Sequence, residues 1–239
     1  MKRIEKNAKN LSGLSESVVH VWQFRIDEAS RAAPGVLASK LSTDELKRAE
    51  SFRVREAARQ FVVCRAVLRI ILGRYLGIPA EDVCFAYSEK GKPYLRDSTS
   101  RISFNLSHSE NICMVGLSVQ AMLGIDVEQI QYGSDYEEVA SATLSAEEIA
   151  NLEEATHPDH RTEVFFECWT RREACMKASG EGLSGQSRGV LLNPGWTILN
   201  FSPYPGYSAA IALSKRPVQL DLWHWRPSGI SFVDRLCDL

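Results

Sequence analysis

Hydrophobic residues recur along this chain at the spacings of both helices and strands. Over residues 56–76 they return every three or four positions, which predicts a long helix with one apolar face. Helices are also predicted over residues 145–153 and about 161–178. Alternating or wholly apolar runs predict strands at 18–26, 83–87, 102–105, 112–119, 122–130, 197–201, 207–213 and 218–225.

Strands and helices mix in each half of the chain without the regular strand–helix–strand alternation of a parallel sheet. The sequence therefore predicts an α+β fold of two similar-sized lobes. A polar, flexible arm is expected over residues 1–16, an N-terminal lobe over 17–118 and a C-terminal lobe over 119–239.

Carboxylates on two of these predicted elements form a pattern that indicates chemistry. Asp126 and Glu128 are two positions apart on the strand over 122–130, so their side chains point the same way. Glu173 and Lys177 are four positions apart on a helix and share one face. Three carboxylates beside one ammonium group suit a hard divalent cation such as Mg²⁺ and a phosphate substrate. The alternative is a solvated strand edge together with a helical Glu173–Lys177 ion pair.

Composition narrows the classes of protein that fit. The 239 residues carry a net charge of −2, so no basic field indicates nucleic-acid binding. No apolar run of about 18 residues predicts a membrane span, and the charged start of the chain is unlike a secretory signal. Six scattered cysteines without a CxxC motif indicate buried, reduced thiols rather than disulfides or zinc ligands. A cytoplasmic protein is expected.

Four segments follow one another in a distinctive order. They are Gly91-Lys92-Pro93, Phe104-Asn105-Leu106-Ser107-His108-Ser109, Gly124-Ile125-Asp126-Val127-Glu128, and a stretch with Trp169, Glu173, Ala174, Lys177, Gly180, Gly182, Leu183 and Ser184. Their order and spacing resemble the 4′-phosphopantetheinyl transferases of the longer, surfactin-synthetase-activating type. The resemblance implies a pseudo-dimer of two similar α+β lobes, with the active site in the cleft between them.

The resemblance also implies the reaction and its metal site. Coenzyme A, the co-substrate, donates its 4′-phosphopantetheine group to a serine of an acyl or peptidyl carrier protein and releases adenosine 3′,5′-bisphosphate. Asp126, Glu128 and Glu173 are expected to bind Mg²⁺ or Mn²⁺. Lys177 is expected to contact the pyrophosphate and stabilise the departing oxyanion. Arg172, expected to bind the coenzyme as well, stands where the family usually has lysine.

Five further residues are expected to bind the coenzyme by the same resemblance. Ser107 and His108, placed in a turn after the strand over 102–105, contact its phosphates, and the others lie at the adenine or the 3′-phosphate. The five are Arg59, Lys92, Pro93, Ser107 and His108. Glu45 occupies an upstream position where the family has a basic residue, so a contact expected there is missing.

Glu148 and the glycines after the last predicted helix each have two possible interpretations. The resemblance makes Glu148 the base that takes the proton of the carrier serine, yet Ser145 and Glu148 also have the spacing of a capping box. Both roles require glutamate. Gly180 and Gly182 can end a helix or lie near a phosphate.

Two other functions remain open on the residues alone. A catalytically silent coenzyme-A-binding protein would not need the full set of three carboxylates and Lys177. A metal-dependent phosphohydrolase would use the same groups with water in place of serine. The resemblance favours the transferase, and a monomer is expected because both lobes lie in one chain.

Overall fold

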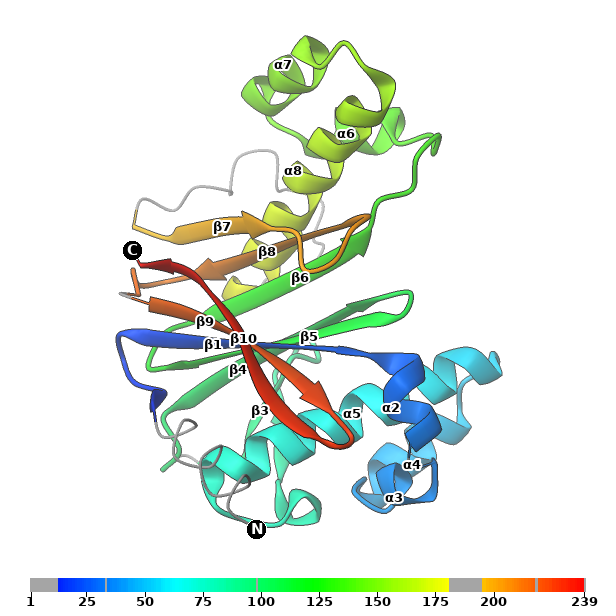
Figure 1. The fold of residues 1–239 in the computed structure, drawn as a ribbon, viewed down its shortest axis with the longest axis vertical. Coiled ribbons are helices and arrows are strands. Elements are labelled where there is room, and N and C mark those ends of the chain that lie inside the picture. The colour runs from blue at the N-terminus through cyan, green and yellow to red at the C-terminus, as the bar shows by residue number, and fades with distance from the viewer. Residues whose placement is uncertain (1–12, 33, 98, 181–194, 218, 239) are drawn as a thin grey trace.

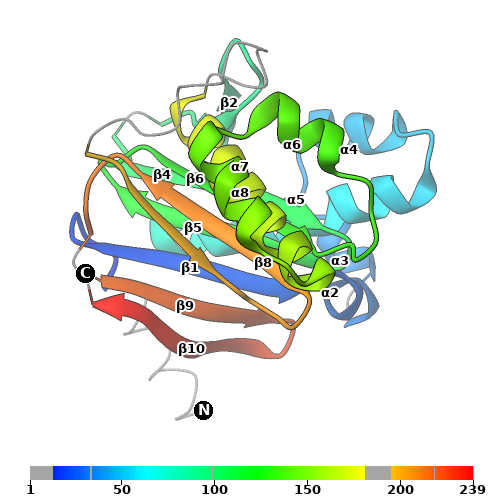
Figure 2. The same cartoon turned by 90° about the horizontal axis from the view of Figure 1, so that it is seen from above.

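Two β-sheets lie face to face, and a long helix covers the outer face of each (Figures 1 and 2). This computed structural model describes residues 13–32, 34–97, 99–180, 195–217 and 219–238. The arrangement is a mixed α+β fold, as the sequence predicts.

The larger sheet has the strand order β10-β9-β1-β5-β4, and the smaller sheet has the order β6-β8-β7. Strands of the larger sheet span Val18–Arg25 (β1), Ile102–Ser109 (β4), Ile112–Val119 (β5), Gln219–Arg226 (β9) and Gly229–Asp238 (β10). Strands of the smaller sheet span Leu123–Gln129 (β6), Thr197–Phe201 (β7) and Tyr207–Leu213 (β8). A separate hairpin consists of Phe85–Tyr87 (β2) and Pro93–Leu95 (β3).

The helices differ greatly in length, and the two longest cover the sheets (Figure 2). They span Ile26–Ala32 (α2), Pro34–Ala38 (α3), Thr43–Glu50 (α4), Arg55–Leu76 (α5), Ala80–Asp82 (η2, a 3₁₀-helix), Glu137–Thr143 (α6), Ala146–Glu154 (α7) and Pro158–Ser179 (α8).

The core has one apolar layer between the sheets and one beneath each long helix. Between the sheets, Ile125 and Val127 of β6 pack with apolar residues of β1, β5 and β8. Beneath α5, Val67 and Leu68 pack with Trp22 and other residues of the larger sheet. Beneath α8 the contact is made largely by alanines: Ala174, Ala178, Ala210 and Ala212. These small side chains let α8 approach the smaller sheet closely.

The predicted helices and strands are confirmed with small shifts at their ends, apart from one strand. The strand predicted over 102–105 continues as β4 to Ser109, so Ser107 and His108 lie in a strand and not in a turn. The reason is that β4 pairs with β5 along its whole length, with Ser109 opposite Ile112. The short helices α2, α3 and α6 and the strand β10 were not predicted, and residues 1–12 of the predicted arm lie outside the described residues.

The last two strands return to the sheet in which the chain begins. β9 pairs in parallel with β1, placing Asp221 opposite His20, and β10 pairs with β9. By sheet pairing, residues 219–238 therefore belong with the N-terminal strands, although the sequence assigns them to the C-terminal lobe. The division into 17–118 and 119–239 stays a prediction.

No helix in the described ranges is long and apolar enough to cross a membrane. The cysteines whose side chains are described, namely Cys64, Cys84, Cys113, Cys168 and Cys175, are free thiols. All of these except the exposed Cys84 are buried, so the interpretation as buried thiols is wrong for that residue.

His20 lies in a buried hydrogen-bonded cluster on β1. Its Nδ1 is 2.6 Å from the Tyr75 hydroxyl, which also accepts a hydrogen bond from Trp22 Nε1 at 3.0 Å. A neutral His20 ring can accept the hydroxyl proton at Nδ1, which leaves the hydroxyl oxygen free to accept from Trp22. Burial lowers the pKa of His20 from 6.5 to about 4, and the charge of Asp221 opposes this only in part.

The free energy of unfolding is expected to fall as the pH is lowered from 6.5 to about 4. In this window the unfolded chain protonates His20 and the folded chain does not, so acid favours unfolding by up to about 3 kcal/mol. Urea unfolding of the wild type and of His20→Asn at both ends of the window measures the contribution. The same pH dependence in the two proteins would contradict it.

Candidate active site

The edge strands β4 and β6 belong to different sheets and are joined by side chains. Ser107 Oγ donates to Asp126 Oδ1 at 2.8 Å, and Ser109 Oγ donates to Glu128 Oε2 at 2.8 Å. Asp126 and Glu128 therefore point to the same side of β6, as the strand alternation predicts. Asp126 is only 1% exposed, so its carboxylate is shielded from solvent, whereas Ser109 and Glu128 are half-buried.

Asn105 and Ser109 belong to this junction, although the sequence alone assigned neither a role. Asn105 Oδ1 accepts a hydrogen bond from the backbone N–H of Ile125 at 2.9 Å, which fixes the strand beside Asp126. Asn105, Ser107 and Ser109 occupy alternate positions of β4 and share one face. Polar residues at every second position would have indicated this shared face if the strand had been predicted to continue to Ser109.

Lys177 of α8 completes a network with both edge strands. Its Nζ lies 2.5 Å from Asp126 Oδ1 and donates to Ser107 Oγ at 2.9 Å. Lys177 therefore pairs with Asp126 of β6. The alternative interpretation, a helical ion pair, has Glu173 as its partner instead. The structure brings together a strand of each sheet and the helix in one hydrogen-bonded group.

β6 and α8 approach so closely that position 124 has no room for a side chain. A Cβ atom on Gly124 would lie 2.0 Å from the carbonyl oxygen of Ala174 and 2.4 Å from the backbone nitrogen of Ala178. Packing alone therefore requires glycine here. Because Gly124 lies two residues before Asp126, and Ala174 directly follows Glu173, this contact sets how near the helix groups come to the strand carboxylates.

Three carboxylates share one ammonium group at this junction. Burial raises the pKa of Asp126, and Lys177 and then Ser107 oppose the rise. Burial and the charge of Asp126 raise the pKa of Glu128. Burial also raises the pKa of Glu173, which Lys177 opposes and Asp126 adds to. Negative charge therefore exceeds positive charge here.

Two oxygen atoms of this group fit a hard cation. Asp126 Oδ2 and Glu173 Oε1 are buried and have no hydrogen-bond partner among the described residues. Such oxygens are costly unless something else satisfies them, and oxygen donors are what Mg²⁺ and Mn²⁺ prefer. Within the described ranges, no three His, Cys, Asp or Glu side chains form a group that could hold a metal ion as it stands. Joint ligation by Asp126, Glu128 and Glu173 stays a prediction.

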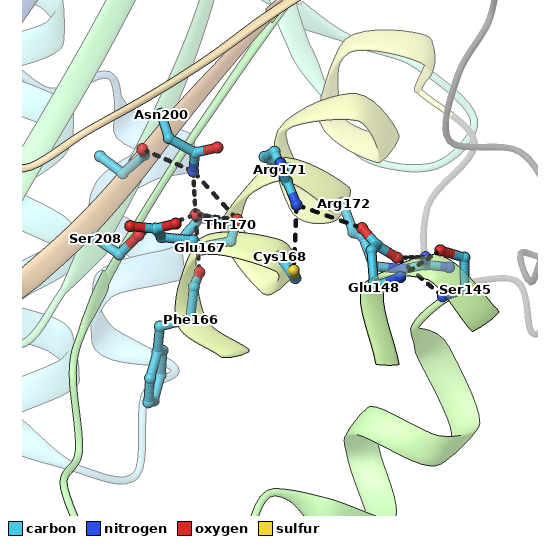
Figure 3. A network of polar contacts seen from close by, with 11 residues as sticks. Ser145, Glu148, Phe166, Glu167, Cys168, Thr170, Arg171, Arg172, Asn200 and Ser208 are labelled. Carbon is cyan, nitrogen blue, oxygen red and sulfur yellow. Dashed lines mark hydrogen bonds and ion pairs between the residues drawn. The ribbon is translucent and has the colours of Figure 1, made fainter. Parts of the chain in front are cut away.

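Glu148 is held at the start of α7 by a capping box and by arginine (Figure 3). Its carboxylate accepts a hydrogen bond from the Ser145 N–H at 2.9 Å, and its own N–H donates to Ser145 Oγ at 3.2 Å. Arg172 of α8 donates to the same carboxylate oxygen at 3.1 Å, and Arg171 lies 3.8 Å from the other. The capping alternative is therefore confirmed, and the role of Glu148 as a base stays a prediction.

Arg172 is buried at this contact, with 3% of the residue exposed. Its ion pair with Glu148 joins α7 to α8 (Figure 3). The predicted contact of Arg172 with the coenzyme is not tested by this geometry, which shows what the guanidinium group binds within the protein.

A second polar group attaches α8 to the smaller sheet (Figure 3). Asn200 of β7 donates to the Glu167 carbonyl at 3.1 Å and to Thr170 Oγ1 at 3.3 Å. Thr170 is fully buried, and its Oγ1 lies 3.3 Å from Ser208 Oγ of β8. These contacts, which local sequence did not indicate, orient the helix that carries Glu173.

His108 lies one residue before the end of β4, and Arg59 lies in the second turn of α5, where it is half-buried. His108 is exposed, and partial loss of hydration and the charge of Lys177 lower its pKa. Arg59 binds Glu56 through Nε at 2.9 Å and also through its terminal nitrogen. A phosphate that binds Arg59 would therefore compete with a carboxylate.

Lys92 and Pro93 connect the β2–β3 hairpin to the site. Lys92 Nζ donates to the carbonyl oxygens of Leu123 at 3.1 Å and Ala178 at 3.3 Å, and also to that of Lys177. The ammonium group is thus directed at the backbone of β6 and α8, whereas the family resemblance implies a place beside the coenzyme. Pro93 begins β3 and is half-buried.

Glu45, which stands where the family resemblance leads one to expect a basic residue, is buried in an internal ion pair. It accepts a hydrogen bond from Arg69 Nε at 2.7 Å, and Arg65 Nε lies 3.5 Å away. Its carboxylate also binds the backbone N–H of Ser42 and so caps α4. Glu45 is therefore part of the packing between α4 and α5.

Gly180 ends α8 in a left-handed conformation with φ 75°, and its N–H donates to the Met176 carbonyl at 3.0 Å. The helix-ending alternative is confirmed for this glycine. Gly182, Leu183 and Ser184 lie outside the described residues.

Comparison with known proteins identifies the class. The sequence profile of the 4′-phosphopantetheinyl transferase superfamily matches residues 122–225, and that of the N-terminal part of 4′-phosphopantetheinyl transferase matches residues 29–120. Together they cover the strands and helices that form the junction. The chain belongs to the 4′-phosphopantetheinyl transferase superfamily.

Individual relatives agree with this assignment. The chain is 33% identical over 229 residues to the 4′-phosphopantetheinyl transferase HetI of Nostoc sp., across 90% of this chain and 95% of that protein. It is 31% identical to a putative 4′-phosphopantetheinyl transferase of Synechocystis sp., across 76% of this chain and 74% of that protein. It is 27% identical to a 4′-phosphopantetheinyl transferase of Bacillus subtilis, across 62% of this chain and 64% of that protein. Membership of the longer, surfactin-synthetase-activating type stays a prediction.

Proposed function

We propose that this protein transfers the 4′-phosphopantetheine group from coenzyme A to a serine of an acyl or peptidyl carrier protein. The observation that carries the proposal is the contact of Lys177 with Asp126 and Ser107 in a chain of this superfamily. One ammonium group beside buried carboxylates, two of whose oxygens are unpartnered in the described structure, suits a pyrophosphate together with a divalent cation.

A pseudo-dimer of two similar lobes, with the site in the cleft between them, is part of this proposal. In support, each sheet carries one helix of 22 residues, α5 on the larger sheet and α8 on the smaller. Ser107 and Asp126 come from the edge strand of each sheet. A pyrophosphate bound beside them would contact both lobes.

The three carboxylates and the lysine have different electrostatic roles in this proposal. Asp126, Glu128 and Glu173 would hold Mg²⁺ or Mn²⁺, which when bound supplies charge neutralisation for the pyrophosphate. Lys177 stabilises the negative charge that develops on the leaving group. Ser107 fixes the Asp126 carboxylate and the Lys177 ammonium group by its two hydrogen bonds.

In the proposed reaction the serine oxygen of the carrier forms a bond to the pantetheine-side phosphorus of coenzyme A. The bond from that phosphorus to the bridging oxygen breaks, and its electron pair leaves with adenosine 3′,5′-bisphosphate. The serine proton passes to the Glu148 carboxylate, directly or through water. Arg172 holds Glu148 in place, and its contact with the coenzyme stays a prediction.

His108 and Arg59 would bind the 3′-phosphate, with Pro93 beside the adenine. An exposed imidazole and a half-buried guanidinium group are suited to an anion that remains partly solvated. A monomer that acts in the cytoplasm on fatty acid, polyketide or nonribosomal peptide carriers stays the expectation.

Arg59→Ala is expected to raise the KM for coenzyme A about tenfold, the loss of one charge-assisted hydrogen bond, with little change in kcat. The contact is made in both ground and transition states. Steady-state kinetics with coenzyme A and with dephospho-coenzyme A, which lacks the 3′-phosphate, measures this. An equal rise in KM for both donors would show that Arg59 does not bind the 3′-phosphate.

The proposed function is tested by measuring adenosine 3′,5′-bisphosphate released from coenzyme A with and without apo carrier protein. Release that requires the carrier supports the transferase. Release without carrier, with free phosphopantetheine as the second product, would establish the phosphohydrolase instead. No release with either, although coenzyme A still binds, would establish a catalytically silent binding protein.

A further inference from the structure

The lysine of the β2–β3 hairpin reaches across to the backbone of β6 and α8. Lys92 Nζ donates to the carbonyl oxygen of Leu123, the first residue of β6, at 3.1 Å. It also donates to the carbonyl oxygens of Lys177 and, at 3.3 Å, of Ala178. One ammonium group therefore holds the beginning of the strand and the last turn of the helix together.

These contacts occupy the ammonium group. A lysine has three N–H donors, and three carbonyl oxygens accept from Lys92. No donor is left for a phosphate oxygen in this arrangement. The last carbonyls of a helix lack partners within the helix and carry partial negative charge, so a cation is stabilising there.

The backbone of the hairpin holds the base of this side chain. Ser88 donates its N–H to the Lys92 carbonyl at 2.9 Å and accepts the Lys92 N–H on its hydroxyl at 3.1 Å. Gly91 takes a left-handed conformation with φ 81°, which closes the turn and which other residues adopt only with strain. Lys92 thus extends from a fixed point.

We propose that Lys92 is a positioning residue that holds the last turn of α8 against β6 and thereby keeps the Lys177 side chain on Asp126 and Ser107. One of the three carbonyls that it binds belongs to Lys177 itself, so that contact acts at the backbone of the residue whose side chain enters the site. The close approach of Gly124 to Ala178 lies next to this contact. The kinetic consequence rests on the proposed function, and the structural consequence does not.

The test replaces Lys92 with methionine, which keeps most of the side-chain volume but has no donor. We expect kcat to fall about tenfold to a hundredfold with coenzyme A and dephospho-coenzyme A alike, because Lys177 is displaced in both reactions. We also expect faster hydrogen exchange of the amides over residues 176–179 than in the wild type. Lys90→Met, an exposed lysine of the same hairpin, is the matched control and should change neither quantity.

The outcomes separate positioning from phosphate binding. A higher KM for coenzyme A alone, with unchanged kcat and unchanged exchange, would overturn the proposal and make Lys92 a ligand of the 3′-phosphate. Unchanged kinetics and exchange would overturn it as well. Lys92→Arg keeps donors, although in a planar arrangement, so its kcat and its hydrogen exchange should lie between those of the wild type and Lys92→Met. If Lys92→Arg and Lys92→Met were equally impaired, loss of the carbonyl contacts would not be the cause. Should the wild type prove inactive, the proposed function fails, while hydrogen exchange still decides the structural claim.

Discussion

Replacing Glu173 with glutamine is expected to lower kcat/KM by roughly a hundredfold or more, because one of the three proposed ligands of the divalent cation that neutralises the pyrophosphate is lost. The variant should nevertheless fold. Glu173 Oε1 is buried without a hydrogen-bond partner in the described structure, and Asp126 adds to the rise in the pKa of Glu173, so the neutral amide relieves repulsion. Transfer kinetics at saturating Mg²⁺ and urea unfolding of the same preparations measure the two effects.

Glu167→Gln is the matched control for this substitution. Glu167 lies on the same helix with an exposed side chain and has no role in the proposed reaction, so its activity and stability should stay close to those of the wild type. Asp126→Asn should lose activity as Glu173→Gln does. If Asp126→Asn and Glu173→Gln both kept full turnover at saturating Mg²⁺, the proposed metal ligands would be wrong.

Gly124→Ala is expected to lower the free energy of unfolding by about 3 kcal/mol or more, because the added methyl group overpacks a rigid contact. Its Cβ would lie 2.0 Å from the Ala174 carbonyl oxygen, and backbone atoms cannot move aside as a flexible side chain can. Any relaxation must push α8 away from β6. Activity should therefore fall even in the fraction that remains folded, because Lys177 is carried away from Asp126.

Gly35→Ala provides the control for the added methyl group. Gly35 lies in α3, where a Cβ atom would meet nothing within 4 Å, and alanine favours a helix. Urea unfolding and transfer kinetics of Gly124→Ala and Gly35→Ala separate the effect of overpacking from the general effect of replacing a glycine. A Gly124→Ala protein as stable and active as the wild type would contradict the close approach of β6 and α8.

Local periodicity was enough to predict part of the site. The two-residue alternation on β6 placed Asp126 and Glu128 on one side, and the helical spacing placed Glu173 and Lys177 on one face. These relations depend only on the conformation of one element. They did not reveal that Lys177 pairs with Asp126, because that contact depends on how α8 docks on β6.

Contacts between distant segments account for what the sequence did not predict. Lys92 is 85 residues from Lys177, whose carbonyl it binds, and Arg172 is 24 residues from Glu148. The family resemblance assigned each residue to the coenzyme, whereas its partner within the protein is a group that no local pattern indicates. The return of β9 to pair with β1 is likewise a long-range pairing, which the division into two consecutive lobes does not contain.

The central claim is tested most directly by intact-protein mass spectrometry of an apo carrier protein incubated with this protein, coenzyme A and Mg²⁺, with and without EDTA. We expect the carrier to gain the mass of one phosphopantetheine group, at a serine, and we expect EDTA to abolish the gain. An unchanged mass for acyl and peptidyl carriers alike, while coenzyme A still binds, would contradict the assignment as a transferase.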